Sequence, residues 1–221
     1  MAIYVTSDAH GHVRALDEAL SKISLASDDT LYVLGDMIDR GPDPVGVIKL
    51  VRSLPNARVL KGNHEQIMLD AIIGQDPLDA ETWDINGGWT TRQQLNDMEF
   101  EAYEELVRWM ATLPLYAVAE TDERPYLLVH AGIETEAARA FLLEHGIDCA
   151  DGVGAVDANS ELLQQMLAVQ SSDDLLWIRH GYWDAPTGLL SAEGKGPVVV
   201  SGHTPTVSLG RYCEVGGTGG A

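Results

Sequence analysis

The sequence predicts an α/β protein whose first third forms a largely parallel sheet. Three short runs rich in strand-forming residues, at 3–6, 30–34 and 57–60, each end in a polar loop. Apolar residues recur at spacings of three and four between the runs, which indicates amphipathic helices. Strand–loop–helix units of about 30 residues, repeated in this way, are typical of βαβ motifs.

The two helices in this region follow from their apolar faces. The first is predicted from residues with helical spacing directly after the first strand: Val13, Leu16, Leu20 and Ile23. The second is predicted over 42–54, where Val47, Ile48 and Val51 share one face.

The rest of the chain continues with mixed elements. Residues 70–113 are predicted to be helical with loops. Further strands are expected at 115–120, 126–129 and 197–200, with helices near 134–145 and 160–169. Residues 216–221 form a Gly-rich end, for which we expect flexibility. The chain shows no internal repeat and no low-complexity linker, so we expect a single domain over 1–221.

Composition and charge exclude several classes of protein. The chain has 221 residues, with 34 acidic and 14 basic side chains and a net charge of −20. Such a charge argues against general nucleic-acid binding and against anionic membrane surfaces. Cys149 and Cys213 are too few for a disulfide framework and are expected to be free thiols. With neither a signal-peptide pattern nor a long apolar stretch, we expect a cytoplasmic protein.

Chemically similar polar residues follow most of the predicted strands. They are carboxylates, imidazoles and an amide, with one arginine among them: Asp8, His10, Asp36, Asp39, Arg40, Asn63, His64, Glu65, His130 and His203. Loops at the carboxyl ends of strands in an open α/β sheet meet at one crevice. Oxygen and nitrogen ligands of this kind suit Mn, Fe, Zn or Co. The sequence therefore predicts a metal site.

The sequence resembles the phosphoprotein phosphatase family of dinuclear metallophosphoesterases. Five motifs carry the resemblance in the family's order over positions 7–204: Ser7-Asp8-Ala9-His10-Gly11, Gly35-Asp36-Met37-Ile38-Asp39-Arg40-Gly41, Gly62-Asn63-His64-Glu65, His130-Ala131-Gly132 and Gly202-His203-Thr204. Within the family, the short chain is similar to bacterial and phage-type Ser/Thr protein phosphatases. The resemblance implies an α/β metallophosphoesterase fold, a four-layer sandwich of two mixed β-sheets flanked by helices.

The resemblance also implies a metal centre with two divalent transition metal ions. Manganese is expected by analogy with bacterial relatives, with iron, zinc, cobalt or nickel as alternatives. The implied ligands are Asp8 and His10 for the first metal, Asp36 as the bridge, and Asn63, His130 and His203 for the second. In such a centre, a hydroxide that bridges the metals attacks phosphorus directly.

Further residues take roles in substrate binding and proton transfer by the same resemblance. His64 is the expected general acid, and Asp39 is expected to fix its tautomer. Arg40 is expected to bind phosphate oxygens together with Asn63, and Arg179, in the segment Leu175-Leu176-Trp177-Ile178-Arg179, is the best match for a second phosphate arginine.

The resemblance favours a protein serine/threonine phosphatase, with tyrosine as a further target, acting on a phosphoprotein or phosphopeptide. The alternative on the same scaffold is a symmetrical diadenosine tetraphosphatase or another nucleotide or RNA-end phosphatase. Glu65 and the intact Asp39-Arg40-Gly41 favour the protein phosphatase. A second alternative is an inactive phosphoprotein-binding module, which would require the loss of a ligand or of His64. The sequence leaves the oligomeric state open.

The pattern departs from the family in two places. Ser7 stands where many members have Gly. After the Gly-His-Thr motif, only a short stretch that ends in Arg211-Tyr212-Cys213-Glu214-Val215 precedes the Gly-rich end, so we expect the usual final C-terminal strands to be missing. The sheet edge left behind would be a liability for stability and association.

Overall fold

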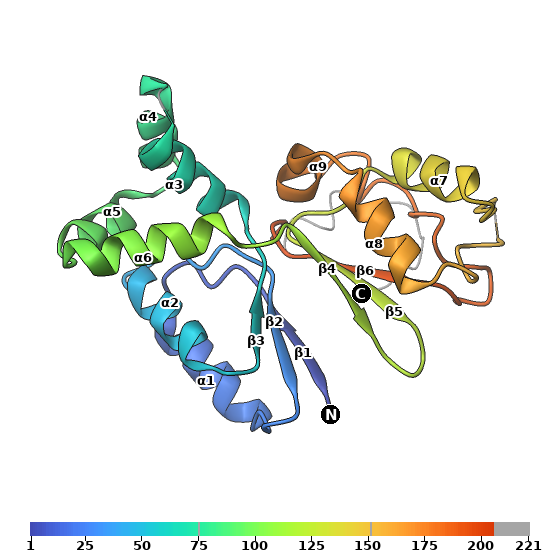
Figure 1. The fold of residues 1–221 in the computed structure, drawn as a ribbon, viewed down its shortest axis with the longest axis horizontal. Helices are drawn as coiled ribbons and strands as arrows, with labels where there is room; N and C mark the ends of the chain where they lie inside the picture. Colours follow the sequence, from blue (N-terminus) through green and yellow to red (C-terminus); the bar gives the residue numbers. More distant parts are fainter. Residues whose placement is uncertain (75, 151, 206–221) are drawn as a thin grey trace. The chain divides into compact units, whose positions relative to one another are not determined.

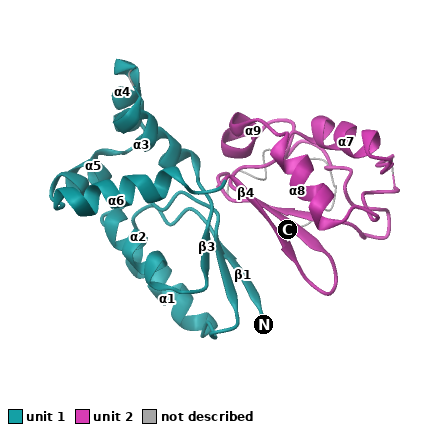
Figure 2. Cartoon of the chain, viewed as in Figure 1, with its two compact units in different colours: residues 1–114 teal, residues 115–221 magenta. Residues whose placement is uncertain are grey.

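The computed structural model describes residues 1–74, 76–150 and 152–205. The chain divides into two compact units, with the boundary between Pro114 and Leu115 (Figure 2). The single domain expected over 1–221 stays a prediction. The expected thiol of Cys213, the Gly-rich end and the missing final strands lie outside the described residues.

Unit 1 is built on a parallel sheet. Its strands are β1 (Ile3–Thr6), β2 (Thr30–Val33) and β3 (Ala57–Val59), in the order β1-β2-β3 (Figure 1). Ile3 pairs with Thr30 across the first ladder, and Leu31 pairs with Ala57 across the second. The parallel βαβ start that the sequence predicts is confirmed.

Helices follow each strand of this sheet and fill the rest of unit 1. They are α1 (Val13–Ile23), α2 (Pro44–Ser53), α3 (Asn63–Ile73), α4 (Pro77–Ile85), α5 (Trp89–Asn96) and α6 (Phe100–Ala111). Helix α2 begins where the Asp43 carboxylate accepts a hydrogen bond of 2.8 Å from Gly46 N, with Pro44 in its first turn. Helix α1 packs on α2, α2 on α5, and α3 on both α4 and α6.

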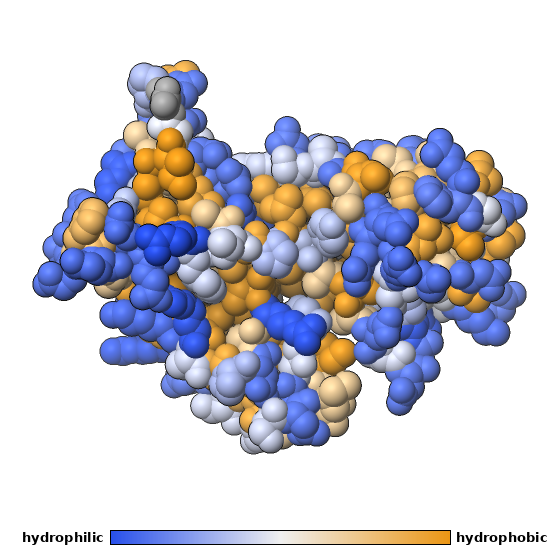
Figure 3. All heavy atoms as spheres, in the orientation of Figure 1, coloured by the Kyte–Doolittle hydropathy of each residue, from blue (hydrophilic) through white to orange (hydrophobic). Residues whose placement is uncertain are grey.

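The core of unit 1 lies between the sheet and these helices. Val33, Ile48, Met68 and Met110 are buried in one continuous cluster. Figure 3 shows apolar residues that remain on the surface around α3 and α4, and the exposed ones there include Ile73, Leu78 and Ile85.

Unit 2 has a mixed sheet. Its described strands are β4 (Tyr116–Glu120), β5 (Pro125–Val129) and β6 (Val198–Val200). The pair β4–β5 is antiparallel and the pair β5–β6 is parallel. The described helices are α7 (Thr135–Glu144), α8 (Ser160–Ala168) and α9 (Ser172–Trp177). Helix α7 packs on α8, and α8 packs on β4.

The expected fold class is confirmed: an α/β protein with two sheets flanked by helices. The first sheet differs from the expected mixed pattern, because its described strands are parallel and joined by helical crossovers. Cys149 is a buried free thiol, and burial raises its pKa. None of the helices in the described part of the chain is long and apolar enough to cross a bilayer.

Candidate active site

In unit 1, the predicted site residues lie in the loops that leave the carboxyl ends of β1, β2 and β3. Backbone hydrogen bonds join the first two loops: His10 N donates to Asp36 O at 2.9 Å, and Gly11 N donates to Met37 O at 2.9 Å. Asp8 N donates to Gly35 O at 3.2 Å. Because the strands are parallel, these loops lie at one edge of the sheet.

The approach of these loops depends on glycine. Gly35 has a φ of +87°, and a Cβ there would lie 2.3 Å from Gly62 N. A Cβ at Gly62 would lie 2.2 Å from Oδ1 of Asp36. Only a residue without a side chain fits at either position, so the Asp36 loop packs directly on the loop that precedes α3.

Backbone strain is concentrated in the predicted site residues. Seven non-glycine residues of the described chain have a positive φ, and one of them, Ser24, lies outside the site. The other six are Asp8, His10, Asp36, Asp39, Arg40 and His203. A left-handed conformation costs an L-residue about 1–2 kcal/mol. Such residues persist where their surroundings hold them, which is characteristic of functional loops.

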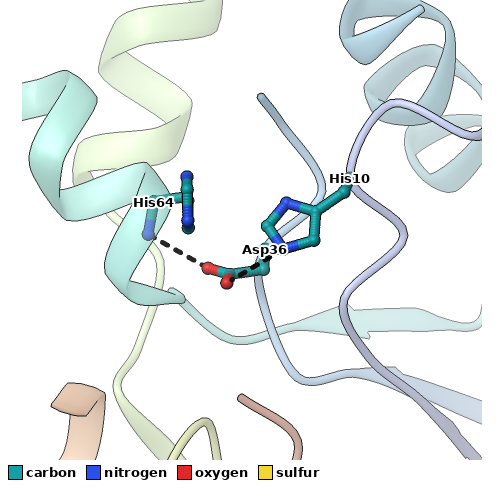
Figure 4. A group of neighbouring side chains, drawn as sticks. All are labelled: His10, Asp36 and His64. Atoms are coloured by element: carbon teal, nitrogen blue, oxygen red, sulfur yellow. Dashed lines mark hydrogen bonds and ion pairs between the residues drawn. The ribbon is translucent and has the colours of Figure 1, made fainter. Parts of the chain in front are cut away.

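His10 and Asp36 form the first pair of candidate metal ligands (Figure 4). Nε2 of His10 lies 3.5 Å from Oδ2 of Asp36. Nδ1 of His10 lies 2.8 Å from the carbonyl oxygen of Ile38, which can only accept, so Nδ1 donates. Burial lowers the pKa of His10, which favours the neutral ring. Nε2 is therefore the unprotonated nitrogen, and its lone pair is available to a hydrogen-bond donor or a metal ion.

This donor set fits a divalent metal ion. Ligand atoms of His10, Asp36 and His64 all lie within 4.8 Å of one another, and the three residues are buried. A neutral imidazole held through its other nitrogen, beside a carboxylate, is a usual ligand pair for transition metals.

His64 has a partner on each nitrogen. Nδ1 lies 2.7 Å from Oδ2 of Asp39, and both side chains are buried. Nη2 of Arg40 lies 2.8 Å from Nε2 of His64, while Nη1 of Arg40 lies 3.0 Å from Nε2 of His10. The guanidinium group therefore spans the two imidazole rings. The backbone N–H of His64 donates to Oδ1 of Asp36 at 3.0 Å.

The carboxylate of Asp39 receives two further donors that the sequence does not reveal. Nε1 of Trp83 donates to Oδ1 and Oδ2 at 3.0 and 3.2 Å. Oγ1 of Thr91 donates to Oδ1 at 2.6 Å and accepts from Asp39 N at 2.9 Å. These residues lie 44 and 52 positions along the chain from Asp39, beyond the reach of any local motif.

Glu65 joins the two loops on either side of the Asp36 carboxylate. Its Oε2 accepts from Asp36 N and from Gly62 N at 2.8 Å each, and its Oε1 accepts from Met37 N at 2.8 Å. Burial, followed by the charge of Asp36, raises the pKa of Glu65 to about 7. Glu65 thus acts as an acceptor for three backbone N–H groups.

In unit 2, His130 and His203 lie together. Each follows one strand of the parallel pair β5–β6, and their ring centroids are 5.1 Å apart. Gly202 N donates to His130 O at 2.8 Å, and both rings are buried. Nη2 of Arg179, just after α9, lies 3.5 Å from the carbonyl oxygen of His203.

The structure thus brings most of the predicted residues together within each unit. Unit 1 gathers His10, Asp36, Asp39, Arg40 and His64, and unit 2 gathers His130, His203 and Arg179. Asp8 lies in the loop after β1, and Asn63 is the buried first residue of α3. The individual roles of these residues in metal and phosphate binding stay predictions.

The chain is similar to one known protein family and to named members of the tetraphosphatases. The calcineurin-like phosphoesterase family model matches residues 1–218. The symmetrical bis(5'-nucleosyl)-tetraphosphatase of Proteus mirabilis is 32% identical over 96% of this chain and 68% of its own length. The enzyme of the same name from Erwinia tasmaniensis is 32% identical over 60% of this chain. The chain spans only 45% of that relative's length.

Solved structures show weaker similarity. A serine/threonine phosphatase from Saccharomyces cerevisiae with similarity to human phosphatase PP5 matches with a TM-score of 0.46 and 20% identity, over 61% of this chain and 39% of its own. A metallophosphoesterase from Sphaerobacter thermophilus matches with a TM-score of 0.43 and 25% identity. The match covers 62% of this chain and 53% of the other. By the family match over nearly its whole length, the chain belongs to the calcineurin-like phosphoesterases.

Proposed function

We propose that this metallophosphoesterase hydrolyses dinucleoside tetraphosphates symmetrically, to two nucleoside diphosphates. The observation that carries the proposal is the 32% identity, over 96% of this chain, to an enzyme named for that reaction. The sequence motifs favoured a phosphoprotein substrate and left the dinucleoside tetraphosphate as the alternative. The proposal puts the dinucleoside tetraphosphate first. The relatives support the nucleotide substrate more strongly than Glu65 supports the protein substrate.

The chain's own residues give the site its chemistry. His10 and Asp36 would hold metal ions, which, when bound, supply positive charge to the phosphate and activate water. Arg40 presents its planar group to the same region and can donate two hydrogen bonds to phosphate oxygens. His64 would donate a proton from Nε2 to the departing oxygen, while the Asp39 carboxylate accepts the hydrogen bond from Nδ1.

The buried pair of His64 and Asp39 favours a second candidate, a protein serine/threonine phosphatase. A departing serine or threonine alkoxide is strongly basic and needs a proton donor, whereas a departing nucleoside diphosphate is a much weaker base. A histidine fixed by a buried carboxylate at 2.7 Å is suited to that demand. Phosphoproteins or phosphopeptides are the partners that this candidate would take.

Product analysis separates the two candidates. The manganese-loaded chain is incubated in parallel with a diadenosine tetraphosphate and with phosphoserine and phosphothreonine peptides, each with a chelated blank. The proposal expects two equivalents of ADP, separated by ion exchange, and much slower phosphate release from the peptides. Release of AMP with ATP, or faster turnover of the peptides, would overturn it.

Two controls complete the experiment. The variant Asp36→Asn, which lacks a candidate metal ligand and is purified in the same way, reports hydrolysis by contaminating phosphatases. Repeating the assay with iron, zinc, cobalt and nickel tests the expectation of manganese. Binding of phosphopeptide without turnover of any substrate, by folded and metal-loaded protein, would favour the inactive binding module instead.

A further inference from the structure

The segment from α4 to α5 reaches the Asp39 carboxylate with two side chains. Trp83, on α4, donates its indole N–H to both carboxylate oxygens. Thr91, on α5, donates its hydroxyl to Oδ1 and accepts the Asp39 backbone N–H. Asp39, Trp83 and Thr91 are all buried, so water does not compete for these bonds.

The turn between the two helices also fixes the neighbouring residue, Arg40. Arg40 N donates to Gly87 O at 3.0 Å, and a Cβ at Gly87 would lie 3.0 Å from Cγ of Arg40. Asp39 and Arg40 have φ values of 68° and 65°. Two consecutive strained residues need outside contacts to hold their backbone. The α4–α5 segment supplies such contacts to both.

The donors define the orientation of the carboxylate. Oδ1 receives the Thr91 hydroxyl at 2.6 Å, and Oδ2 receives His64 Nδ1 at 2.7 Å. Without the Thr91 hydroxyl, Oδ1 would lose a donor in a site that water does not reach. The carboxylate could then rotate, and its bond to His64 would lengthen or change direction.

We propose that Trp83 and Thr91 are positioning residues that hold the Asp39 carboxylate so that it fixes His64 for proton transfer to poor leaving groups. The inference rests on the proposed phosphohydrolase chemistry, and it concerns leaving groups that need a proton, such as those of the second candidate substrate. It assigns to the α4–α5 segment a role in the chemistry of the site, in addition to the place of Trp83 in the core of unit 1.

The test compares three threonine variants on two substrates. Thr91→Val removes the hydroxyl with little change of shape, and Thr91→Ser retains it. Thr90→Val is the matched control, because Thr90 is its buried neighbour on the same helix and its hydroxyl has no hydrogen-bond partner among the described residues. The first substrate is an alkyl phosphate monoester, whose strongly basic leaving group needs a proton. The second is 4-nitrophenyl phosphate, whose weakly basic leaving group departs largely without one.

We expect Thr91→Val to lower kcat for the alkyl phosphate by about tenfold, with KM nearly unchanged, because a buried carboxylate loses a donor. The same variant should change 4-nitrophenyl phosphate turnover by less than about twofold. Thr91→Ser should restore the ratio of the two rates, and Thr90→Val should leave it unchanged. An equal loss on both substrates, or no loss on either, would overturn the inference.

A second measurement needs no turnover. The Nδ1 proton of His64, held in a short bond to a carboxylate, should give a far-downfield proton NMR signal. Thr91→Val and Trp83→Phe should shift or broaden it, and Thr90→Val should not. If the signal is unchanged in both Thr91→Val and Trp83→Phe, the positioning role is overturned. If the wild-type chain hydrolyses neither of these monoesters nor diadenosine tetraphosphate, the proposed function fails, and this spectrum still decides the positioning role.

Discussion

Nδ1 of His64 and Oδ2 of Asp39 are 2.7 Å apart, and both side chains are closed to solvent. The carboxylate can only accept when ionised, so it selects the tautomer with the proton on Nδ1. The other nitrogen, Nε2, is then the atom through which His64 can take or give a proton. This pair, more than any other contact of unit 1, distinguishes a proton-transfer site from a plain metal-binding site.

Replacing His64 by asparagine should therefore slow the hydrolysis of substrates with poor leaving groups more than that of substrates with good ones. We expect His64→Asn to lower kcat for an alkyl phosphate by about a hundredfold or more, since general acid catalysis contributes that much. Turnover of 4-nitrophenyl phosphate should fall far less. The control is His145→Asn, because His145 is exposed at the end of α7 and its Nδ1 bonds Phe141 O of the same helix. Equal losses on the two substrates would contradict the general-acid role.

Metal binding should depend on Asp36. Asp36→Asn removes a negative charge beside Nε2 of His10, while the amide can still accept from His64 N. We expect metal content after dialysis, measured by elemental analysis, to fall together with activity, with affinity at least about tenfold lower. The exposed Asp17→Asn, on α1, is the matched control. Retention of all bound metal and of full activity by Asp36→Asn would refute the assignment.

The sequence predicts the parts of the site that depend on strand ends. Polar residues directly after β1, β2 and β3 had to meet, because parallel strands bring their carboxyl ends to one edge. His10, Asp36 and His64 were found in this way. Five motifs in order also gave the family, since their joint occurrence is far more specific than any one of them.

The contacts from α4 and α5 could not be predicted in the same way. Residues 70–113 carry helical patterns, but periodicity does not say where a helix packs. Trp83 is buried in the core of unit 1, yet its polar N–H needs a partner, and only the tertiary structure identifies that partner. Helix α9 was missed for another reason: it is short, although Ser171, which accepts from Asp174 N at 3.0 Å, marks its start.

Glu65 should contribute to stability through the backbone it bonds. Glu65→Gln keeps the shape but replaces one acceptor oxygen by a donor, so a buried N–H of Asp36, Met37 or Gly62 loses its acceptor. We expect the free energy of unfolding to fall by about 1–3 kcal/mol. Urea denaturation would be measured well above the Glu65 pKa of about 7, where the carboxylate is ionised. The exposed Glu104→Gln on α6 should be neutral, and a neutral Glu65→Gln would show that the loops do not depend on this acceptor.

A pair of glycine variants isolates the close approach of the two loops from the strain of a left-handed backbone. Gly35 and Gly146 have similar φ values, +87° and +82°, but a Cβ at Gly146 meets nothing within 4 Å. Gly146→Ala should therefore cost about 1–2 kcal/mol of unfolding free energy, from backbone strain alone. Gly35→Ala adds a contact of 2.3 Å with Gly62 N, which can be relieved only by moving the Asp36 loop. We expect its cost to exceed that of Gly146→Ala by at least about 2 kcal/mol, together with loss of bound metal. Equal costs for the two variants in urea denaturation would mean that the loops can separate without loss of stability.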